Sequence, residues 1–289
     1  MNNPLVTVFG GAGFIGRHLV RSLAAKGRRV KVISRTPGLC GHLQPLGDVG
    51  QIIVQSVDLA DERALSELLK GSNAAINLIG ILYETSKQRF DDVHGQFPGQ
   101  MAKAAAEAGV RRVVHLSAIG ADPQSSSAYA RSKAEGERAV KEAFEPAVIL
   151  RPSIVIGPED DFFNRFAAMA RLSPALPLIG GGKTRFQPIY VADVSAAIMK
   201  ALELDSAKGE VFDLGGPKIY TFAELMRYML AIIGRKRWLM NLSFGLAELQ
   251  ARFLELLPHP LLTRDQVELL KSDNVVDETA KTLADLQIT

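Results

Sequence analysis

The strongest constraint on the fold is a regular alternation of short apolar runs and helix-length segments through the first half of the chain. Runs such as LVTVFG, RVKVIS and NAAINLIG are apolar on both sides, as strands are when helices cover both faces of a sheet. The segments between them, such as FIGRHLVRSLAAKG, repeat apolar residues at helical spacing. Because connections between parallel strands are right-handed, the pattern predicts an α/β fold of the Rossmann type. This is a doubly wound parallel sheet that binds ligands at the carboxyl ends of its strands.

The alternation weakens after Gly157, where glycine-rich turns begin to mix with helical segments. We therefore predict a dinucleotide-binding core over residues 1–157 and a smaller C-terminal α/β lobe over residues 158–289, interleaved with the core. A strand near residues 210–214 is expected to rejoin the main sheet. The run AVILRPSIVIG, residues 147–157, predicts one continuous buried strand.

Composition excludes several classes of function. The chain has 34 Lys and Arg against 31 Asp and Glu, and a net charge of +3 is too small to indicate nucleic-acid binding. The single cysteine, Cys40, fits a reducing compartment, and the five scattered histidines lack metal-ligand spacing, so no metal site is expected. No run of about 18 apolar residues predicts a membrane span. The first residues enter a strand-like run directly, so no signal or transit peptide is expected.

The first predicted strand leads into a glycine-rich turn, VFGGAGFIGRH. Glycines at this spacing allow a tight turn and let the backbone approach a pyrophosphate at the N-terminus of the following helix. A turn of the same shape without a ligand is the alternative, but the strand–turn–helix context favours nucleotide binding. The predicted contacts in this segment are Gly10, Gly13, Phe14, Ile15, Gly16 and Arg17.

The end of the second predicted strand indicates which nucleotide binds. A site for NAD usually has an acidic residue there for the ribose hydroxyls, whereas this chain has Ser34 and Arg35. Arg35 can pair with a 2′-phosphate and Ser34 can donate a hydrogen bond to it, with Arg17 as a second candidate. Two solvated arginines are the alternative. The sequence predicts NADP(H) over NAD(H).

Two later strand ends complete the predicted nucleotide site. Asp58 is placed to meet the adenine amine, or alternatively to cap the helix that starts near Asp61. The fourth strand ends at Leu78, Ile79 and Gly80, where small residues let the backbone approach the cofactor.

Tyr129 and Lys133, in SSSAYARSKAEGE, are four residues apart and so lie on one face of a predicted helix. An ammonium group near a phenol favours the phenolate, and it can also bind the nicotinamide ribose. Ser117 ends the strand RVVHLS and is placed to orient a carbonyl, although the serines at 125–127 compete for that role. A helix with an exposed tyrosine and lysine is the alternative.

Two segments of the C-terminal lobe have more than one interpretation. The three acids at 159–161 resemble a general-acid site but are more often a solvated loop or a helix N-terminus, so no catalysis is assigned to them. Residues 235–257 begin with a basic cluster and Trp238 and continue as an amphipathic helix pattern. This pattern suits contact with a membrane surface or a partner's groove, and equally a helix that covers a substrate cavity.

Together, GGAGFIG, YARSK and LRPSIVIGPED resemble the extended or atypical short-chain dehydrogenase/reductase superfamily over most of the chain. The resemblance implies that Tyr129 and Lys133 match the catalytic pair of that family and that Pro152 and Ser153 pass beneath the nicotinamide. Ser117 is the candidate for the family's serine, although the usual later position falls on Ile119.

A narrower resemblance rests on LQPLGDVGQIIVQSVDLAD, NAAINLIGILYETSKQRFDDVH and HPLLTRDQVELLKSDNVV. These segments are similar to the subgroup of the NADPH-binding, reductase-like accessory subunit of respiratory complex I and its bacterial relatives. The resemblance implies bound NADPH, a role in assembly or stability without established turnover, and other complex I subunits of the peripheral arm as partners, near the membrane surface. It also implies a position on the cytoplasmic side of a bacterial inner membrane, or on the matrix side in mitochondria, and a C-terminal tail beyond LADLQIT.

Two other functions stay open because the chain keeps a complete Tyr-x-x-x-Lys. One is a stand-alone NADP-dependent reductase or epimerase acting on a carbonyl or sugar nucleotide, with Tyr129 as the acid, Lys133 as its tuner and Ser117 as the orienting residue. The other is a sensor that reports NADPH occupancy to a partner.

Overall fold

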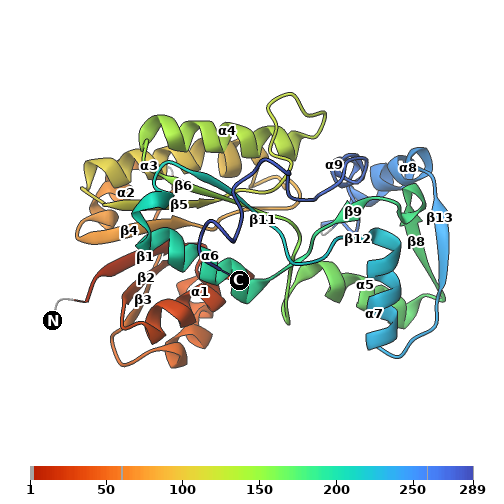
Figure 1. Ribbon diagram of the computed structural model, residues 1–289, viewed down its shortest axis with the longest axis horizontal. Helices are drawn as coiled ribbons and strands as arrows, with labels where there is room; N and C mark the ends of the chain where they lie inside the picture. Colours follow the sequence, from red (N-terminus) through yellow and green to blue (C-terminus); the bar gives the residue numbers. More distant parts are fainter. Residues whose placement is uncertain (1–2, 60, 259, 289) are drawn as a thin grey trace.

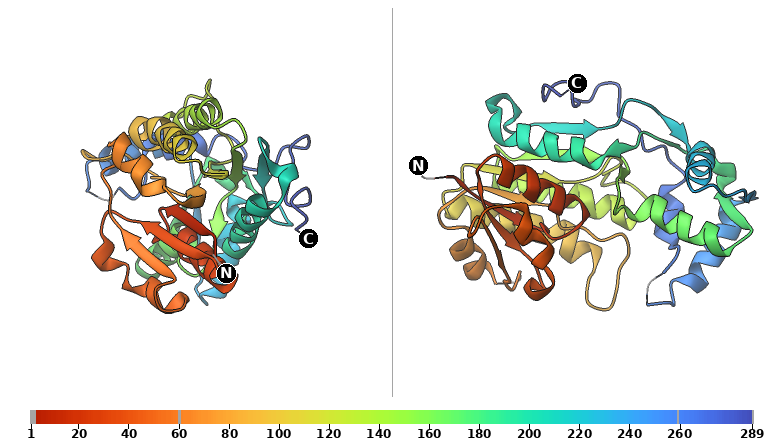
Figure 2. Two further views of the ribbon diagram at one scale, coloured as in Figure 1. Left: turned by 90° about the vertical axis from the view of Figure 1, so that its left-hand side faces the viewer. Right: turned by 90° about the horizontal axis from the view of Figure 1, so that it is seen from below.

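A computed structural model of the 289-residue chain describes residues 3–59, 61–258 and 260–288. The molecule is elongated, with the core at one end and the C-terminal lobe at the other (Figure 1; Figure 2, right). The core is built on a seven-stranded parallel sheet with the strand order β11-β6-β5-β4-β1-β2-β3. Its strands are β1 (Leu5–Phe9), β2 (Arg29–Ile33), β3 (Ile52–Gln55), β4 (Ser72–Asn77), β5 (Arg112–Leu116), β6 (Val148–Pro152) and β11 (Val211–Leu214).

Helices cover both faces of this sheet, which explains why its strands are apolar on both sides. Within β1, Val8 packs into one hydrophobic cluster and its neighbour Phe9 into the other. The first cluster contains side chains of α1 (Phe14–Ala25) and α6 (Val191–Glu203), and the second contains those of α2 (Glu62–Leu69), α3 (Phe97–Glu107) and α4 (Ala128–Ala143) (Figure 1). The predicted Rossmann-type fold is confirmed.

The C-terminal lobe combines short strand pairs with helices around its own hydrophobic cluster. Its pairs are β8 (Ala175–Ile179) with β13 (Trp238–Leu242) and β9 (Arg185–Phe186) with β12 (Tyr220–Thr221), while β7 (Val155–Ile156) pairs with β10 (Ile189–Tyr190). Its helices are α5 (Asp161–Leu172), α7 (Phe222–Ile232), α8 (Phe244–Leu254) and α9 (Arg264–Leu269). Shorter 3-10 segments span Pro37–Leu39, Gly41–Leu46, Gly180–Gly182 and Asp205–Ala207, and a π-helical turn spans Asp91–Gln96. Across the described ranges, we find no helix with the length and apolar character that a membrane span needs.

Two predicted elements differ from the structure. The run at 147–157 is not one strand. β6 ends at Pro152, which has no N–H to donate. The chain then pairs with β10 instead, since the Ile154 carbonyl accepts a hydrogen bond from the Ile189 amide. The helix pattern at 235–257 is also wrong in its first part. Residues 238–242 form β13 because they pair in parallel with β8, and α8 begins only after Ser243, whose side chain caps it.

The last described residues return from α9 to the core (Figure 1). Lys281 forms a parallel bridge with Phe212 of β11, and Leu286 is fully buried among side chains of α1 and α6. Residues 281–288 therefore contribute to the packing of the core rather than to the lobe alone.

Candidate nucleotide-binding site

The predicted site residues gather at one edge of the sheet, because parallel strands present their carboxyl ends on the same side. The strand order changes direction between β1 and β4, and this is where Gly10 approaches Leu78. A Cβ atom on Gly10 would lie 3.1 Å from the carbonyl carbon of Leu78. Ser34, Arg35 and Asp58 follow β2 and β3, Leu78, Ile79 and Gly80 follow β4, Ser117 follows β5, and Pro152 and Ser153 end or follow β6.

The glycine turn has the geometry that a phosphate-binding loop requires. Gly10 has a φ of +78°, and a Cβ atom on Gly16 would lie 2.4 Å from the Gly10 carbonyl oxygen. Gly13 is the N-cap residue of α1, and among the described residues no side chain caps this helix end. The amides of its first turn, at Phe14 and Ile15, are therefore suited to an anionic ligand such as a pyrophosphate.

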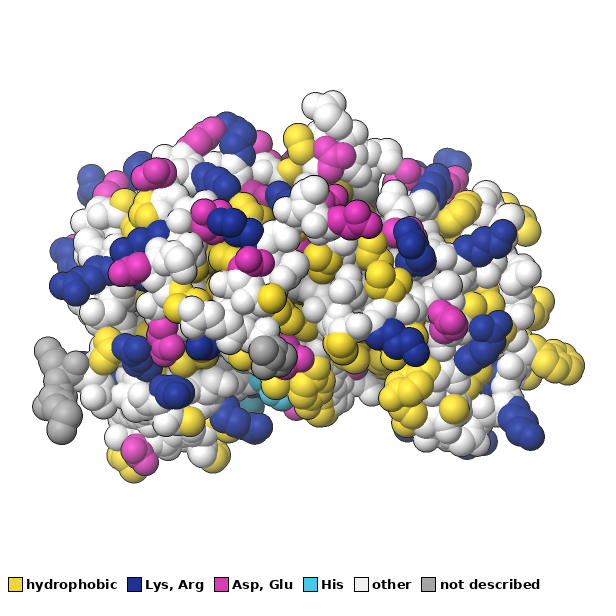
Figure 3. Space-filling view, in the orientation of Figure 1, with side chains coloured by type: hydrophobic (Ala, Val, Ile, Leu, Met, Phe, Trp, Pro, Cys, Tyr) yellow, Lys and Arg dark blue, Asp and Glu magenta, His cyan; other side chains and the backbone are white. Residues whose placement is uncertain are grey.

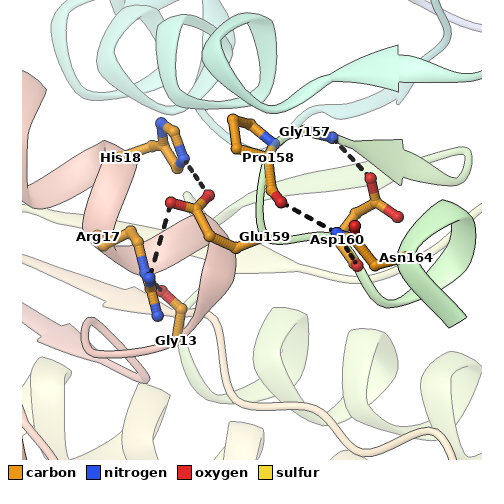
Figure 4. A network of polar contacts seen from close by, with 8 residues as sticks. All are labelled: Gly13, Arg17, His18, Gly157, Pro158, Glu159, Asp160 and Asn164. Carbon is orange, nitrogen blue, oxygen red and sulfur yellow. Dashed lines mark hydrogen bonds and ion pairs between the residues drawn. The ribbon is translucent and has the colours of Figure 1, made fainter. Parts of the chain in front are cut away.

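Arg17 is paired with an acidic residue from the start of the C-terminal lobe (Figure 4). Its guanidinium lies 3.7 Å from one carboxylate oxygen of Glu159, and the other oxygen lies 3.1 Å from Nε2 of His18. The hydrogen bond from His18 is the main reason that the pKa of Glu159 is lowered. Asp160 instead caps α5, accepting from the Phe163 amide at 2.6 Å, which confirms the helix N-terminus interpretation for this residue.

At the second strand, Arg35 is exposed, and Ser34 Oγ accepts the Thr36 amide at 3.3 Å, which leaves the hydroxyl proton to donate. Asp58 lies in the loop after β3, but Asp61, not Asp58, caps α2, accepting from the two amides at 63 and 64. The alternative role of Asp58 as a helix cap is therefore wrong. Its predicted contact with adenine stays a prediction, as does the preference for NADP(H).

Tyr129 and Lys133 lie together on α4, with the lysine Nζ 5.8 Å from the centre of the phenol ring. Burial lowers the pKa of Lys133 to about 8, against an opposing effect of Glu137, and its Nζ donates to Leu116 O at 3.4 Å. Burial, and next the Asp265 carboxylate, raise the pKa of Tyr129 to about 12. This is opposite to the direction that the spacing predicted, and it leaves Tyr129 a protonated donor.

A buried histidine that the sequence analysis missed supports Tyr129. His94 lies in the π-helical turn, stacked on Phe90 and edge-on to the Tyr129 ring at 5.2 Å between centroids. Its Nε2 accepts the Ile81 amide at 2.9 Å, so the ring proton is on Nδ1 and is donated to Ser132 Oγ at 3.1 Å. Burial is the main cause that lowers its pKa to about 2, so the ring is neutral. No motif or spacing in the sequence marks His94 as a residue that contacts Tyr129.

Two buried hydrogen-bond donors at the carboxyl end of β5 have no acceptor in the part of the chain that the structure describes. Within the described residues, Ser117 Oγ and His115 Nε2 are buried without a hydrogen-bond partner. His115 Nδ1 is 3.2 Å from the Asn77 amide nitrogen, so Nε2 carries the proton. These two groups offer hydrogen bonds without matching acceptors, and the Lys133 ammonium has further hydrogens besides the one donated to Leu116 O, which fits the hydroxyls of a ribose and the carboxamide of a nicotinamide.

The side chain of Ser153 faces the C-terminal segment. Its hydroxyl is 2.9 Å from the main-chain oxygen and 2.7 Å from the Oδ1 of Asn274, whose Nδ2 donates to Ile119 O at 3.2 Å. Asn274 thus joins the loops that follow β5 and β6. The predicted passage of Pro152 and Ser153 beneath the nicotinamide stays a prediction.

A doubly wound parallel sheet with a glycine-rich turn at the carboxyl ends of its strands is typical of nucleotide-dependent enzymes and their relatives. The profile of the NAD dependent epimerase/dehydratase family matches residues 6–215, and the chain belongs to this family. Among solved structures, it resembles a dTDP-glucose 4,6-dehydratase from Streptomyces venezuelae with NAD bound. The TM-score is 0.72 at 24% identity, over 83% of this chain and 84% of that one.

Two curated relatives give a narrower likeness. NADH dehydrogenase (ubiquinone) 1 alpha subcomplex subunit 9, mitochondrial, from Arabidopsis thaliana is 37% identical over 98% of this chain and 74% of its own length. A ceramide reductase from Caulobacter vibrioides is 31% identical over 82% of this chain and 73% of its own length. The chain therefore resembles both a respiratory-complex subunit and a bacterial enzyme.

Proposed function

We propose that this chain is an NADP(H)-binding accessory subunit of respiratory complex I, NADH:quinone oxidoreductase, which supports the assembly or stability of the complex. Nucleotide binding is supported by the hydrogen-bond donors beside Tyr129, namely the Lys133 ammonium and the unpaired Ser117 hydroxyl at the carboxyl end of β5. The name of the Arabidopsis thaliana relative supports the choice of complex.

Selection of NADP(H) over NAD(H) is part of the proposal. It is supported by Ser34 and Arg35 at the end of β2, where no acidic side chain would repel a 2′-phosphate. The guanidinium of Arg35 is exposed and adjoins this strand end.

Attachment through the C-terminal lobe is a further part of the proposal. Residues 235–257 combine the basic residues 235–237 with apolar side chains on the surface, of which Trp238 is 76% and Phe253 66% exposed. Figure 3 shows hydrophobic side chains at the surface of this end of the molecule. We assign this surface to contact with other complex I subunits of the peripheral arm and with the nearby membrane, on the cytoplasmic side in a bacterium.

The nucleotide would act by stabilising the folded chain. A ligand that binds only the native state stabilises it by about 4 kcal/mol at a thousandfold excess over its dissociation constant. Gly13→Val places a branched side chain at the N-terminus of α1, so we expect bound nucleotide, melting temperature and retention in the complex to fall together. Loss of nucleotide with normal retention would contradict the stabilising role.

The second candidate is an NADP-dependent reductase, favoured by the likeness to the Caulobacter vibrioides ceramide reductase. Tyr129 would then donate the proton to a carbonyl oxygen as hydride arrives at the carbon. Tyr129→Phe distinguishes the two functions. It should abolish turnover in a reductase and leave complex assembly intact in an accessory subunit.

The deciding experiment is a native gel of gently solubilised membranes from cells carrying a tagged chain, stained for NADH dehydrogenase activity. Migration of the tag with the stained band is the expected result. Migration of the tag at low mass only would overturn the accessory-subunit proposal and favour the reductase.

A further inference from the structure

Two of the most distinctive sequence motifs contact each other across the molecule. SSSAY, residues 125–129, begins α4 and carries Tyr129, and TRDQVE, residues 263–268, forms the start of α9 in the C-terminal lobe. Ser126 Oγ donates to Glu268 at 2.5 Å, 142 positions along the chain. The site described above does not account for this contact.

Asp265 is the centre of the contact. One carboxylate oxygen accepts the Ala128 amide at 2.6 Å, and the other accepts the Ser127 hydroxyl at 2.8 Å and the Tyr129 amide at 3.2 Å. The first turn of α4, Ala-Tyr-Ala-Arg, contains no acid of its own, so Asp265 supplies the negative charge that a helix N-terminus favours. A residue of the lobe therefore caps the helix that carries Tyr129.

The remaining residues of TRDQVE fix α9 within the lobe. Thr263 and Gln266 form a capping box, and Arg264 Nε donates to Glu255 at 2.9 Å. Val267 is fully buried in a small cluster with side chains of α8. Because α9 is anchored on the lobe side, movement of the lobe and movement of the N-terminus of α4 are mechanically linked.

A second contact joins α9 to the nucleotide edge of the sheet. Gln266 Nε2 donates to Leu82 O at 3.3 Å, in the loop that follows β4. The Ile81 amide in the same loop binds His94, which contacts the Tyr129 ring. The helix α9 thus touches two of the elements that line the predicted nicotinamide end of the site.

We propose that Asp265 is a positioning residue through which nucleotide binding at Tyr129 and docking of α9 stabilise each other. The inference rests on the proposed function only in that NADP(H) binds at Tyr129 and Lys133. If occupancy orders the N-terminus of α4, it strengthens the surface to which Asp265 binds. By reciprocity, a docked α9 strengthens nucleotide binding by the same factor.

The test compares the full-length wild-type chain with Asp265→Ala and Asp265→Asn, with and without NADPH. Thr221→Ala is the matched control, because Thr221 caps α7 in the same lobe. We expect NADPH to slow amide hydrogen exchange in residues 125–133 and in 244–269 of the wild type. In Asp265→Ala, protection of 244–269 should be lost and NADPH affinity should fall about tenfold, a typical coupling between sites. Thr221→Ala should lower the melting temperature without either change.

The coupling itself is measured by NADPH affinity and hydrogen exchange, and a titration of the phenol checks that the Asp265 carboxylate lies beside Tyr129 in solution. The absorbance of Tyr129, taken as the difference from Tyr129→Phe, should show a lower pKa in Asp265→Asn than in the wild type, because the carboxylate charge is gone. Unchanged NADPH affinity and unchanged exchange in both Asp265 variants would overturn the inference, whatever the titration shows. If wild type fails to bind NADPH at all, the proposed function fails instead.

Discussion

The core and the C-terminal lobe use their apolar residues differently. In the core, two large clusters fill both faces of the sheet, and the polar residues of the candidate site gather at one edge. In the lobe, the clusters are smaller and many large apolar side chains stay on the surface. The difference agrees with the proposed function, in which the core binds the nucleotide at its polar edge and the lobe offers its apolar surface to a partner. The exposed side chains include Trp238, Met240, Leu246, Leu249, Phe253, Leu256, Leu257 and Leu261.

The largest effect is expected at the glycine turn between β1 and α1. Gly16→Ala would place a Cβ atom 2.4 Å from the Gly10 carbonyl oxygen, so backbone must shift. We expect the free energy of unfolding to fall by about 3 kcal/mol and NADPH binding to be lost. Chemical denaturation and extraction of bound nucleotide measure both. Gly41→Ala is the control, since a Cβ atom there meets nothing within 4 Å. Equal behaviour of the two variants would contradict the role of the turn.

Lys133 should give the core a distinctive dependence on pH. Burial lowers the pKa of Lys133 from 10.5 to about 8. Between pH 8 and pH 10.5, Lys133 is therefore protonated in the unfolded chain but mostly neutral in the folded one. The cost of burying the charge is fully present below pH 8 and is relieved as pH rises towards 10.5, so stability rises with pH. The total is on the order of 3 kcal/mol. Denaturation of wild type and Lys133→Met should show a difference that grows in favour of wild type across this range. Parallel curves would contradict the buried charge.

Nucleotide selection should depend on one exposed side chain. Arg35→Asp removes a charge-assisted hydrogen bond of about 1.5–3 kcal/mol to a 2′-phosphate, so the NADPH to NADH affinity ratio should fall about 10- to 100-fold. Fluorescence titration with each nucleotide measures the ratio. Arg29→Asp, at the opposite end of β2, is the matched control and should leave the ratio unchanged. A similar fall in both variants would point to overall charge instead.

The smallest effect on stability, with the largest effect on attachment, is expected in the lobe. Trp238→Ser and Phe253→Ser alter side chains that are 76% and 66% exposed, so the free energy of unfolding should change by about 0.5 kcal/mol or less. Migration with the NADH dehydrogenase band should nevertheless be lost. Leu39→Ser, which changes a residue of the core that is 77% exposed, should keep both. Normal migration of the lobe variants would place the attachment surface elsewhere.

The strand edge of the site could be predicted because it follows from local sequence and one topological rule. Gly10, Ser34, Gly80 and Ser117 each come directly after a run of apolar residues, and parallel strands bring such positions together. The same reasoning could not supply the pKa of Tyr129, because its direction depends on burial and on Asp265, 136 positions away in the chain.

The lobe was harder to predict because its elements depend on distant pairing. The pattern of residues 238–242 is compatible with a helix as well as with a strand. The pairing of β13 with β8 decides in favour of the strand. His94 was missed for a related reason. Its role depends on the π-helical turn and on the Ile81 amide, neither of which leaves a periodic signal.

The return of the chain to the core affects how the protein is made. Leu286 belongs to the same hydrophobic cluster as Leu19 and Leu23 of α1, so this cluster is completed only after the intervening lobe has been translated. While the ribosome is translating the lobe, one face of the nascent sheet lacks part of its cover. Until then the cluster exposes apolar surface, and exposed apolar surface in an incompletely folded chain favours chaperone binding.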